Sequence, residues 1–159
     1  MNTYTESATG LGAEIVFFKA DHSTAASGRP WNIKRQRNPG MAPTIDSRNI
    51  LRPETVESLY IAFQLTGDRI YREWGWQIFQ SFQRWCQVDN GDGGYAGIDD
   101  VDNVDHKQID RMETFWLSET LKYLYLLFAR RNQLAFHDWV FNTEAHPLPV
   151  FEPSFSTNV

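Results

Sequence analysis

The segment FNTEAHPLP places a hydroxyl, a carboxylate and an imidazole close together near the end of the chain. These groups belong to Thr143, Glu144 and His146, and the prolines Pro147 and Pro149 stiffen the backbone that follows. Calcium and similar hard cations bind hydroxyl, carbonyl and carboxylate oxygens. A rigid Thr-Glu tip therefore indicates a candidate cation site.

Two further carboxylates lie at the beginning of a predicted helix. Glu54 and Glu57 are three residues apart, so their side chains can approach each other on one helix surface. One interpretation makes them exposed first-turn glutamates that the helix dipole favours. However, the apolar Ile61 and Leu65 share the side of Glu54, which suggests an enclosed helix whose acidic end faces a polar cavity.

A fourth carboxylate lies in the apolar segment METFWLSETLKYLYLLF, which predicts a buried helix. On a helical wheel Glu119 falls among Met112, Phe115, Tyr123 and Leu126. Because desolvating a carboxylate is costly, this side chain needs a partner. A buried salt bridge or capping contact is one alternative, and a carboxylate facing a cation or a sugar is the other. Likewise, Phe115 is either a core residue or a ring that stacks on a ligand.

These carboxylates favour some kinds of chemistry and exclude others. Glycoside hydrolysis uses two carboxyl groups on either side of the scissile bond. Cys86 is the only cysteine, which excludes a cysteine-rich zinc site, and no nucleophile-elbow motif supports a serine triad. The loop DDVDNVDHKQID around His106 lacks the spacing of an EF-hand, so we predict a solvated acidic loop.

Composition limits the partners and the compartment. The 159 residues suit one domain, and 42% are hydrophobic, which is enough for a core. A net charge of −5 without a basic block makes nucleic acid and anionic membrane surfaces poor candidate partners, so we expect no nucleic-acid partner. The sequence contains no transmembrane segment, since no stretch approaches about 18 apolar residues. Its beginning also lacks the features of a signal peptide, so we expect no targeting signal in this chain.

Apolar periodicity predicts an all-α fold. The predicted helices cover residues 53–66, 69–87 and 110–130. Pro53 begins the first helix, Gly67 ends it as a C-cap glycine, and Asp68 is the N-cap of the second.

Three segments lie outside these helices. Residues 21–48 form a long predicted loop with Trp31 and Ile33 as anchor points. Residues 90–97, NGDGGYAG, form a turn or hairpin. The proline-containing segment 139–150 is predicted to be a short extended plug.

Four segments carry a resemblance to a known family. LRPETVESLY (51–60), METFWLSETLKYLYLLF (112–128) and VFNTEAHPLP (140–149) resemble C-terminal signatures of the class I α-1,2-mannosidases, glycoside hydrolase family 47. TGLGAE (9–14) resembles a further family segment, with Ala13 where proline is usual. The segments occur in the family's order, so the resemblance covers most of this chain but only the last part of the family's catalytic domain.

The resemblance implies a fold and an activity. It implies that residues 1–159 form part of the family's catalytic domain, namely the C-terminal part of an (α/α)7 barrel with a short extended C-terminal plug. The implied reaction is calcium-dependent, inverting removal of α-1,2-linked mannose from high-mannose N-glycans. Family members work in the endoplasmic reticulum or Golgi, or are secreted.

The resemblance also assigns site residues. Glu54 is implied to be the catalytic base that acts on water, and Thr143 to be the direct calcium ligand through its hydroxyl and carbonyl oxygens. The implied substrate- and water-binding residues are Arg52, Glu57, Phe115, Glu119 and Glu144. We therefore expect these carboxylates and Thr143 to converge on one cavity.

One part of the expected machinery is missing from the resemblance. The family's general acid lies upstream of the resembling segments, and an inverting glycosidase needs both carboxyl groups. Two hypotheses follow. The chain is either part of a mannosidase that is active only together with the N-terminal part of the barrel, or a non-catalytic remnant that is at most a weak calcium or glycan binder.

Overall fold

The computed structural model describes residues 1–18, 28–36, 38, 40–88, 93–129 and 133–151. Its helical elements are α1 (Asn2–Thr5), the 3-10 turn η1 (Ile45–Ser47), α2 (Glu54–Thr66), α3 (Ile70–Cys86), the π-helical turn η2 (Trp116–Thr120) and α4 (Leu121–Phe128). Its strands are β1 (Phe17–Phe18), β2 (Trp31–Asn32), β3 (Gly97–Ile98), β4 (Gln108–Ile109), β5 (Trp139–Phe141) and β6 (Pro147–Pro149). The strands form three antiparallel pairs, β1–β2, β3–β4 and β5–β6.

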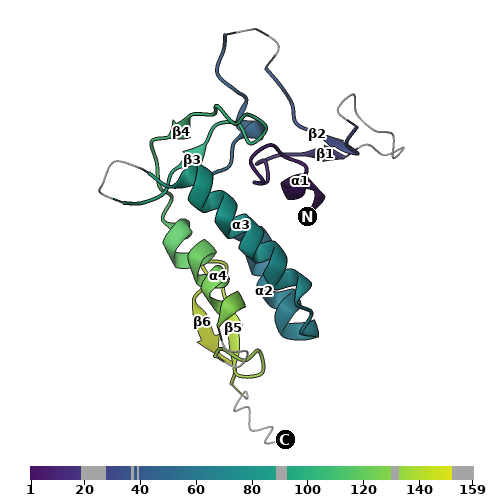
Figure 1. The fold of residues 1–159 in the computed structure, drawn as a ribbon. Helices are drawn as coiled ribbons and strands as arrows, with labels where there is room; N and C mark the ends of the chain where they lie inside the picture. Colours follow the sequence, from purple (N-terminus) through teal and green to yellow (C-terminus); the bar gives the residue numbers. More distant parts are fainter. Residues whose placement is uncertain (19–27, 37, 39, 89–92, 130–132, 152–159) are drawn as a thin grey trace, which may run out of the picture.

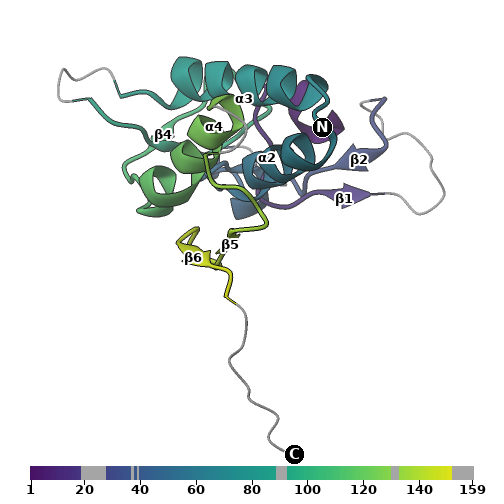
Figure 2. The same cartoon turned by 90° about the horizontal axis from the view of Figure 1, so that it is seen from below.

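Three helices and one hairpin carry the tertiary structure. Helix α3 lies against both α2 and α4, as Figure 1 shows. In the view of Figure 2, α3 lies on one side of α2 and α4, and the β5–β6 hairpin lies on the other. The all-α expectation is therefore correct for the packed helices, and small strand pairs accompany them. Within the described residues, no helix is long and apolar enough to cross a membrane.

The predicted boundary between the first two helices is confirmed. Gly67 adopts a left-handed conformation with a φ of 73°, and its N–H donates to the carbonyl of Phe63 over 2.8 Å. This is the geometry that glycine provides at a helix C-terminus. The carboxylate of Asp68 then accepts a hydrogen bond from the N–H of Ile70 over 3.0 Å, which satisfies a free donor at the beginning of α3.

The third predicted helix begins later than expected. Residues 110–130 were predicted, but the chain becomes helical only at the π-helical turn η2 and continues through α4 to Phe128. The reason is non-local, because Gln108 and Ile109 pair with β3, and the chain needs the following residues to turn back. The predicted end at residue 130 lies outside the described residues.

Buried aromatic side chains join the helices. Trp116 is fully buried, and its ring lies 4.9 Å from that of Phe82 and 4.7 Å from that of Tyr95. At the C-terminal end of α4, the carbonyls of Leu127 and Ala129 accept hydrogen bonds from the guanidinium of Arg72, over 2.7 and 2.9 Å. Arg72 therefore satisfies carbonyl groups at the end of α4 from α3.

The predicted loop 21–48 is anchored as expected in its described part. Trp31 and Ile33 are 1% and 7% exposed, and the indole N–H of Trp31 donates to the Glu6 carboxylate over 2.7 Å. Residues 19–27, 37 and 39 lie outside the described residues. Of the predicted hairpin 90–97, residues 90–92 also lie outside them, but Gln87 and Tyr95 form an antiparallel bridge, as a hairpin requires.

The extended conformation predicted for residues 139–150 is confirmed for its paired strands. Strands β5 and β6 pair antiparallel, with Phe141 opposite Pro147. The ring of Phe141 contacts Tyr60 of α2 and Tyr123 of α4, with centroid distances of 6.1 and 5.6 Å. The hairpin is therefore packed against α2, which carries Glu54 and Glu57, and against α4, which follows the η2 turn that carries Glu119.

Candidate active site

The beginning of α2, the η2–α4 segment and the β5–β6 turn contribute carboxylates to one region. Glu119, in η2, is 8% exposed. Burial raises the pKa of its carboxyl group, and the negative charges of Glu144, Glu54 and Glu57 raise it further, while Lys122 lowers it. The structure thus brings four carboxylates from three separate segments within electrostatic range of one another. In the described part of the chain, Glu119 has no salt-bridge partner.

Glu57 is held by a tyrosine of α4. The hydroxyl of Tyr123 donates to Oε1 of Glu57 over 3.2 Å. Burial, followed by the charge of Glu57, raises the pKa of Tyr123, so the phenol remains a donor at neutral pH. Both side chains line a pocket of about 290 Å³ whose other walls are apolar and come from α2 and the C-terminal segment: Ile61, Phe136, Trp139, Val140 and Phe141.

The β5–β6 turn presents Thr143 to solvent. The side-chain carbonyl of Asn142 accepts hydrogen bonds from the N–H groups of Glu144 and His146, over 3.1 and 2.9 Å. Ala145 is fully buried with a φ of 55°, and its carbonyl accepts a hydrogen bond from Nζ of Lys122 over 2.8 Å. The turn is therefore fixed to α4, while Thr143 makes no hydrogen bond to any described residue.

These features fit a bound cation. Three neighbouring carboxylates raise the pKa of Glu119, and Lys122 is the one charged group that lowers it. A bound cation would therefore reduce the repulsion among the four carboxylates. The hydroxyl and carbonyl oxygens of Thr143 remain available as ligands. No group of three or more His, Cys, Asp or Glu side chains among the described residues is arranged to hold a metal ion directly. A cation here would accordingly depend on Thr143 and on water, with the glutamates orienting the water.

Arg52 and Phe115 form the adjoining wall, together with a residue that the sequence analysis did not assign. Nε of Arg52 donates to Oε1 of Glu14 over 2.7 Å, and Nη1 lies 3.9 Å from Oε1 of Glu54. The guanidinium carbon lies 5.7 Å from the ring centroid of Phe115. The hydrogen bond to Glu14 raises the pKa of Arg52. The only signal for Glu14 was its place at the end of TGLGAE.

Glu54 is less enclosed than expected. Its side chain is 64% exposed, and Ile61 and Leu65 are 38% and 71% exposed. The expectation that α2 is enclosed on both flanks is therefore wrong for the described chain. The physical reason is that no described element covers Leu65 and Glu54, while Ile61 only lines the pocket beside β5.

The acidic loop after β3 is not simply solvated, which corrects the prediction for Asp99–Asp110. Asp100 is 9% exposed and pairs with Arg35 over 2.5 Å. Asp102 pairs with Arg29 and Arg35, over 2.8 and 2.7 Å. Arginines from the preceding loop provide the missing partners, a pairing that sequence spacing does not reveal.

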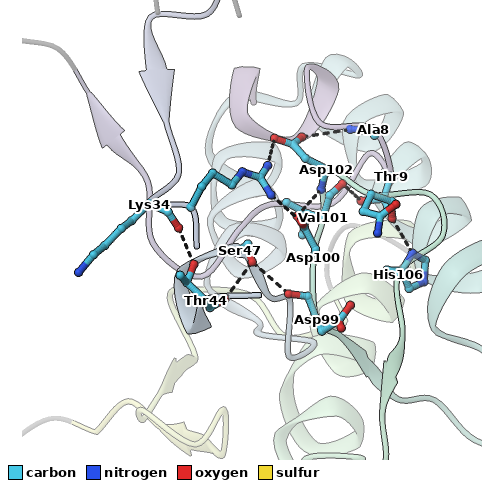
Figure 3. Close-up of polar contacts among 12 residues, drawn as sticks. Ala8, Thr9, Lys34, Thr44, Ser47, Asp99, Asp100, Val101, Asp102 and His106 are labelled. Carbon is cyan, nitrogen blue, oxygen red and sulfur yellow. Dashed lines mark hydrogen bonds and ion pairs between the residues drawn. The ribbon is translucent and has the colours of Figure 1, made fainter. Parts of the chain in front are cut away.

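Further hydrogen bonds fix the same loop to the N-terminal segment and to η1 (Figure 3). The hydroxyl of Thr9 donates to the carbonyl of Val101 over 2.8 Å, and that of Ser47 lies 2.9 Å from the carbonyl of Thr44 and 3.1 Å from that of Asp99. These contacts support the segment that leads into Arg52 and Glu54.

The known proteins described next, to which this chain is similar, all belong to one kind of enzyme. The family model described as Glycosyl hydrolase family 47 matches residues 1–150. The endoplasmic reticulum mannosyl-oligosaccharide 1,2-alpha-mannosidase of Homo sapiens is 46% identical over 148 residues, which are 92% of this chain and 19% of the relative. The corresponding protein of Schizosaccharomyces pombe is 44% identical over 150 residues, which are 94% of this chain and 26% of the relative.

A solved structure agrees with these relatives. The alpha-1,2-mannosidase from Trichoderma reesei superposes on 94% of this chain with a TM-score of 0.76 and 29% sequence identity. The superposition covers 32% of that chain. This chain therefore spans about a quarter or less of the curated relatives described above, and about a third of the solved neighbour.

Proposed function

The chain belongs to glycosyl hydrolase family 47, and from this premise we propose that it forms one wall of the active site of an inverting, calcium-dependent α-1,2-mannosidase. The proposed architecture is the C-terminal part of an (α/α)7 barrel, in which β5–β6 is the plug. The names of the relatives, which are mannosyl-oligosaccharide 1,2-alpha-mannosidases, support this activity. The proposed substrate is the α-1,2-linked mannose of high-mannose N-glycans, and the proposed compartment is the secretory pathway.

One observation carries the proposal. The negative charges of Glu54, Glu57 and Glu144 raise the pKa of the buried carboxyl group of Glu119, in addition to the effect of burial. Collecting negative charges in this way is unfavourable for folding alone. Such an arrangement is favourable when the region binds a cation and polyhydroxylated ligands, and glycoside hydrolysis uses carboxylates of this kind.

The roles of the individual residues follow from their positions. Glu54 is open to solvent, and we assign it the role of the base that takes a proton from the attacking water. Phe115 offers an apolar ring on which a sugar can stack. Arg52 donates to Glu14, its guanidinium lies near both that ring and Glu54, and we assign it the role of donor to sugar hydroxyls.

The calcium ion would be held by the hydroxyl and carbonyl oxygens of Thr143. Bound there, it would supply coordination for sugar hydroxyls and favour a distorted sugar ring. Glu57, Glu119 and Glu144 would accept hydrogen bonds from surrounding waters and sugar hydroxyls. Tyr123 and Lys122 would keep Glu57 and the β5–β6 turn in position.

The test is mannose release from α-1,2-linked mannobiose with calcium present. The chain is assayed alone and together with the separately produced part of the Schizosaccharomyces pombe relative that lies outside the match. We expect release only from the mixture, because the family's general acid is implied to lie outside this chain. Glu54→Gln should lower the rate of the mixture by about 10²-fold or more, and nuclear magnetic resonance should show β-mannose as the first product. Release that is unaffected by Glu54→Gln would refute the assignment.

A second candidate function is non-catalytic binding of calcium or glycan. The observation that favours it is the exposure of Glu54, Thr143 and Glu144, since an open site does not exclude water. Calorimetry that detects calcium binding, combined with no mannose release from the mixture, would support this candidate over the mannosidase.

A further inference from the structure

Two described residues other than glycine adopt a left-handed backbone conformation, and each is next to residues of the candidate active site. Leu51, with a φ of 69°, comes directly before Arg52, and Ala145, with a φ of 55°, directly follows Glu144. Both Leu51 and Ala145 are fully buried. The left-handed conformation is sterically unfavourable for a residue with a Cβ atom, so it persists only where surrounding contacts enforce it.

Side chains from one short stretch hold the carbonyl groups of both residues. The hydroxyl of Thr120 donates to the carbonyl of Leu51 over 2.6 Å, and Nζ of Lys122 donates to that of Ala145 over 2.8 Å. Thr120 is fully buried and directly follows Glu119 in the π-helical turn η2. Turns of this kind occur frequently at functional sites. The stretch that carries Glu119 therefore also holds the two segments that carry the other candidate carboxylates.

The backbone at Leu51 is held on both sides. Its N–H donates to Oδ1 of Asn49 over 2.9 Å, and Nδ2 of Asn49 donates to the carbonyl of Gly12 over 2.8 Å. Because a peptide unit is planar, hydrogen bonds to the N–H and to the carbonyl of one residue fix both of its backbone torsion angles. Asn49 and Thr120 together therefore impose the left-handed conformation on Leu51.

The conformation of Leu51 is transmitted to Glu54. The carbonyl that Thr120 holds belongs to the peptide unit that joins Leu51 to Arg52. The ring of the following Pro53 fixes its own φ and restricts the conformation of Arg52, and α2 begins at Glu54. The backbone between the held carbonyl and Glu54 therefore has little freedom, and the direction of that carbonyl sets the place of Glu54.

We propose that Thr120 is a positioning residue for the proposed catalytic base. Through the carbonyl of Leu51 it fixes Glu54 relative to Glu119, while its own buried side chain does not reach the substrate. This inference rests on the proposed function, in which Glu54 takes a proton from the attacking water. A general base must lie within hydrogen-bond reach of its water, so a small displacement of Glu54 slows the chemical step more than it weakens substrate binding.

Thr120→Val tests the proposal in the active mixture, because it retains the shape of the side chain and removes the donor. The variant is assayed with α-1,2-linked mannobiose, calcium and the separately produced part of the Schizosaccharomyces pombe relative that lies outside the match. We expect kcat to fall about tenfold or more, with KM changed by less than about twofold. Thr120→Ser, which retains the hydroxyl, should restore most of kcat.

Two further variants separate positioning from folding. Thr120→Ala opens space for a water molecule that can satisfy the Leu51 carbonyl without fixing its direction, so it should fold and still lower kcat. Thr66→Val, at the opposite end of α2 from Glu54, is the matched control, because the hydroxyl of Thr66 also donates to a backbone carbonyl, that of Ala62, over 2.7 Å. The control should leave kcat and KM unchanged. Circular dichroism gives the folded fraction by which each kcat is corrected.

Amide hydrogen exchange of the 159-residue chain alone tests the structural step without activity. Exchange at the N–H of Leu51, followed by nuclear magnetic resonance, should become about tenfold faster or more in Thr120→Val and Thr120→Ala, because this N–H is protected only while Leu51 keeps its conformation. Thr66→Val should leave it unchanged.

Unchanged exchange at Leu51 in both Thr120 variants would overturn the proposal. A loss of activity that falls on KM instead of kcat, or that Thr120→Ser does not reverse, would overturn it as well. If even the unchanged chain releases no mannose in the mixture, while Leu51 exchanges faster without the Thr120 hydroxyl, the proposed function fails and the hold of Thr120 on Leu51 stands. The two failures are therefore distinguishable.

Discussion

Glu14 accepts a hydrogen bond from Nε of Arg52 over 2.7 Å, which ties the N-terminal segment to the beginning of α2. The N–H of Glu14 in turn donates to the carbonyl of Arg48 over 2.8 Å. Residues 38 positions apart thereby fix the direction of one guanidinium beside Phe115 and Glu54.

Glu14→Gln tests this relationship. The substitution retains the shape but removes the charge, so we expect the free energy of unfolding to fall by about 0.5–1 kcal/mol, a small value because Arg52 is 47% exposed. Urea unfolding measures this change. A double-mutant cycle with Arg52→Gln should show that the two effects are coupled, and strictly additive effects would contradict the pairing.

Glu119→Gln tests the crowding of carboxylates through the pH dependence of the free energy of unfolding. Because the pKa of Glu119 is raised above 4.5 in the folded state, the folded protein keeps a proton that the unfolded chain has already released. The free energy of unfolding therefore falls as pH rises through the window above 4.5, until the folded-state pKa is passed. The Glu119→Gln variant should have a higher free energy of unfolding than the unchanged chain at neutral pH. This difference should become smaller at pH values below 4.5.

The measurement is urea unfolding at several pH values without calcium. Glu73→Gln, an exposed change on α3, is the control and should show no such pH-dependent gain. A gain from Glu119→Gln that is equal at all pH values would show that the carboxyl group is not the cause.

Thr143→Val tests the proposed calcium ligand. Calcium at about 100 times its dissociation constant should stabilise the chain by about 2.7 kcal/mol. Thr143→Val retains the shape without the hydroxyl and should lose most of this gain, whereas Thr143→Ser should keep much of it. Thermal unfolding with and without calcium provides the readout, and equal responses from both variants would place the ligand elsewhere.

Gly97→Ala tests how the loop after β3 supports the site. A Cβ atom on Gly97 would lie 2.7 Å from the carbonyl oxygen of Asn49 and 3.2 Å from Cα of Ile50. Both contacts are backbone atoms of the segment before Arg52, so neither can move freely. We expect a loss of about 1–3 kcal/mol in the free energy of unfolding, with Lys107→Ala, at an exposed position nearby, changing it by less than about 0.5 kcal/mol.

The amino-acid sequence alone determined the features that depend on neighbouring residues. Gly67 and Asp68 end one helix and begin the next because backbone conformation and capping act within a few residues. The extended conformation of the β5–β6 segment was likewise predictable from Pro147 and Pro149. The candidate site residues were named from motif resemblance and from the placement of Glu119 in an apolar helix.

Only the tertiary structure decided which of these groups meet. It brought Glu119 within electrostatic range of Glu144, Glu54 and Glu57, and it paired Arg52 with Glu14. It also delayed the third helix to Trp116, because strand pairing held the preceding residues. Contacts of this kind depend on chain reversal and packing over long sequence separations, whereas periodicity and capping report only on local conformation.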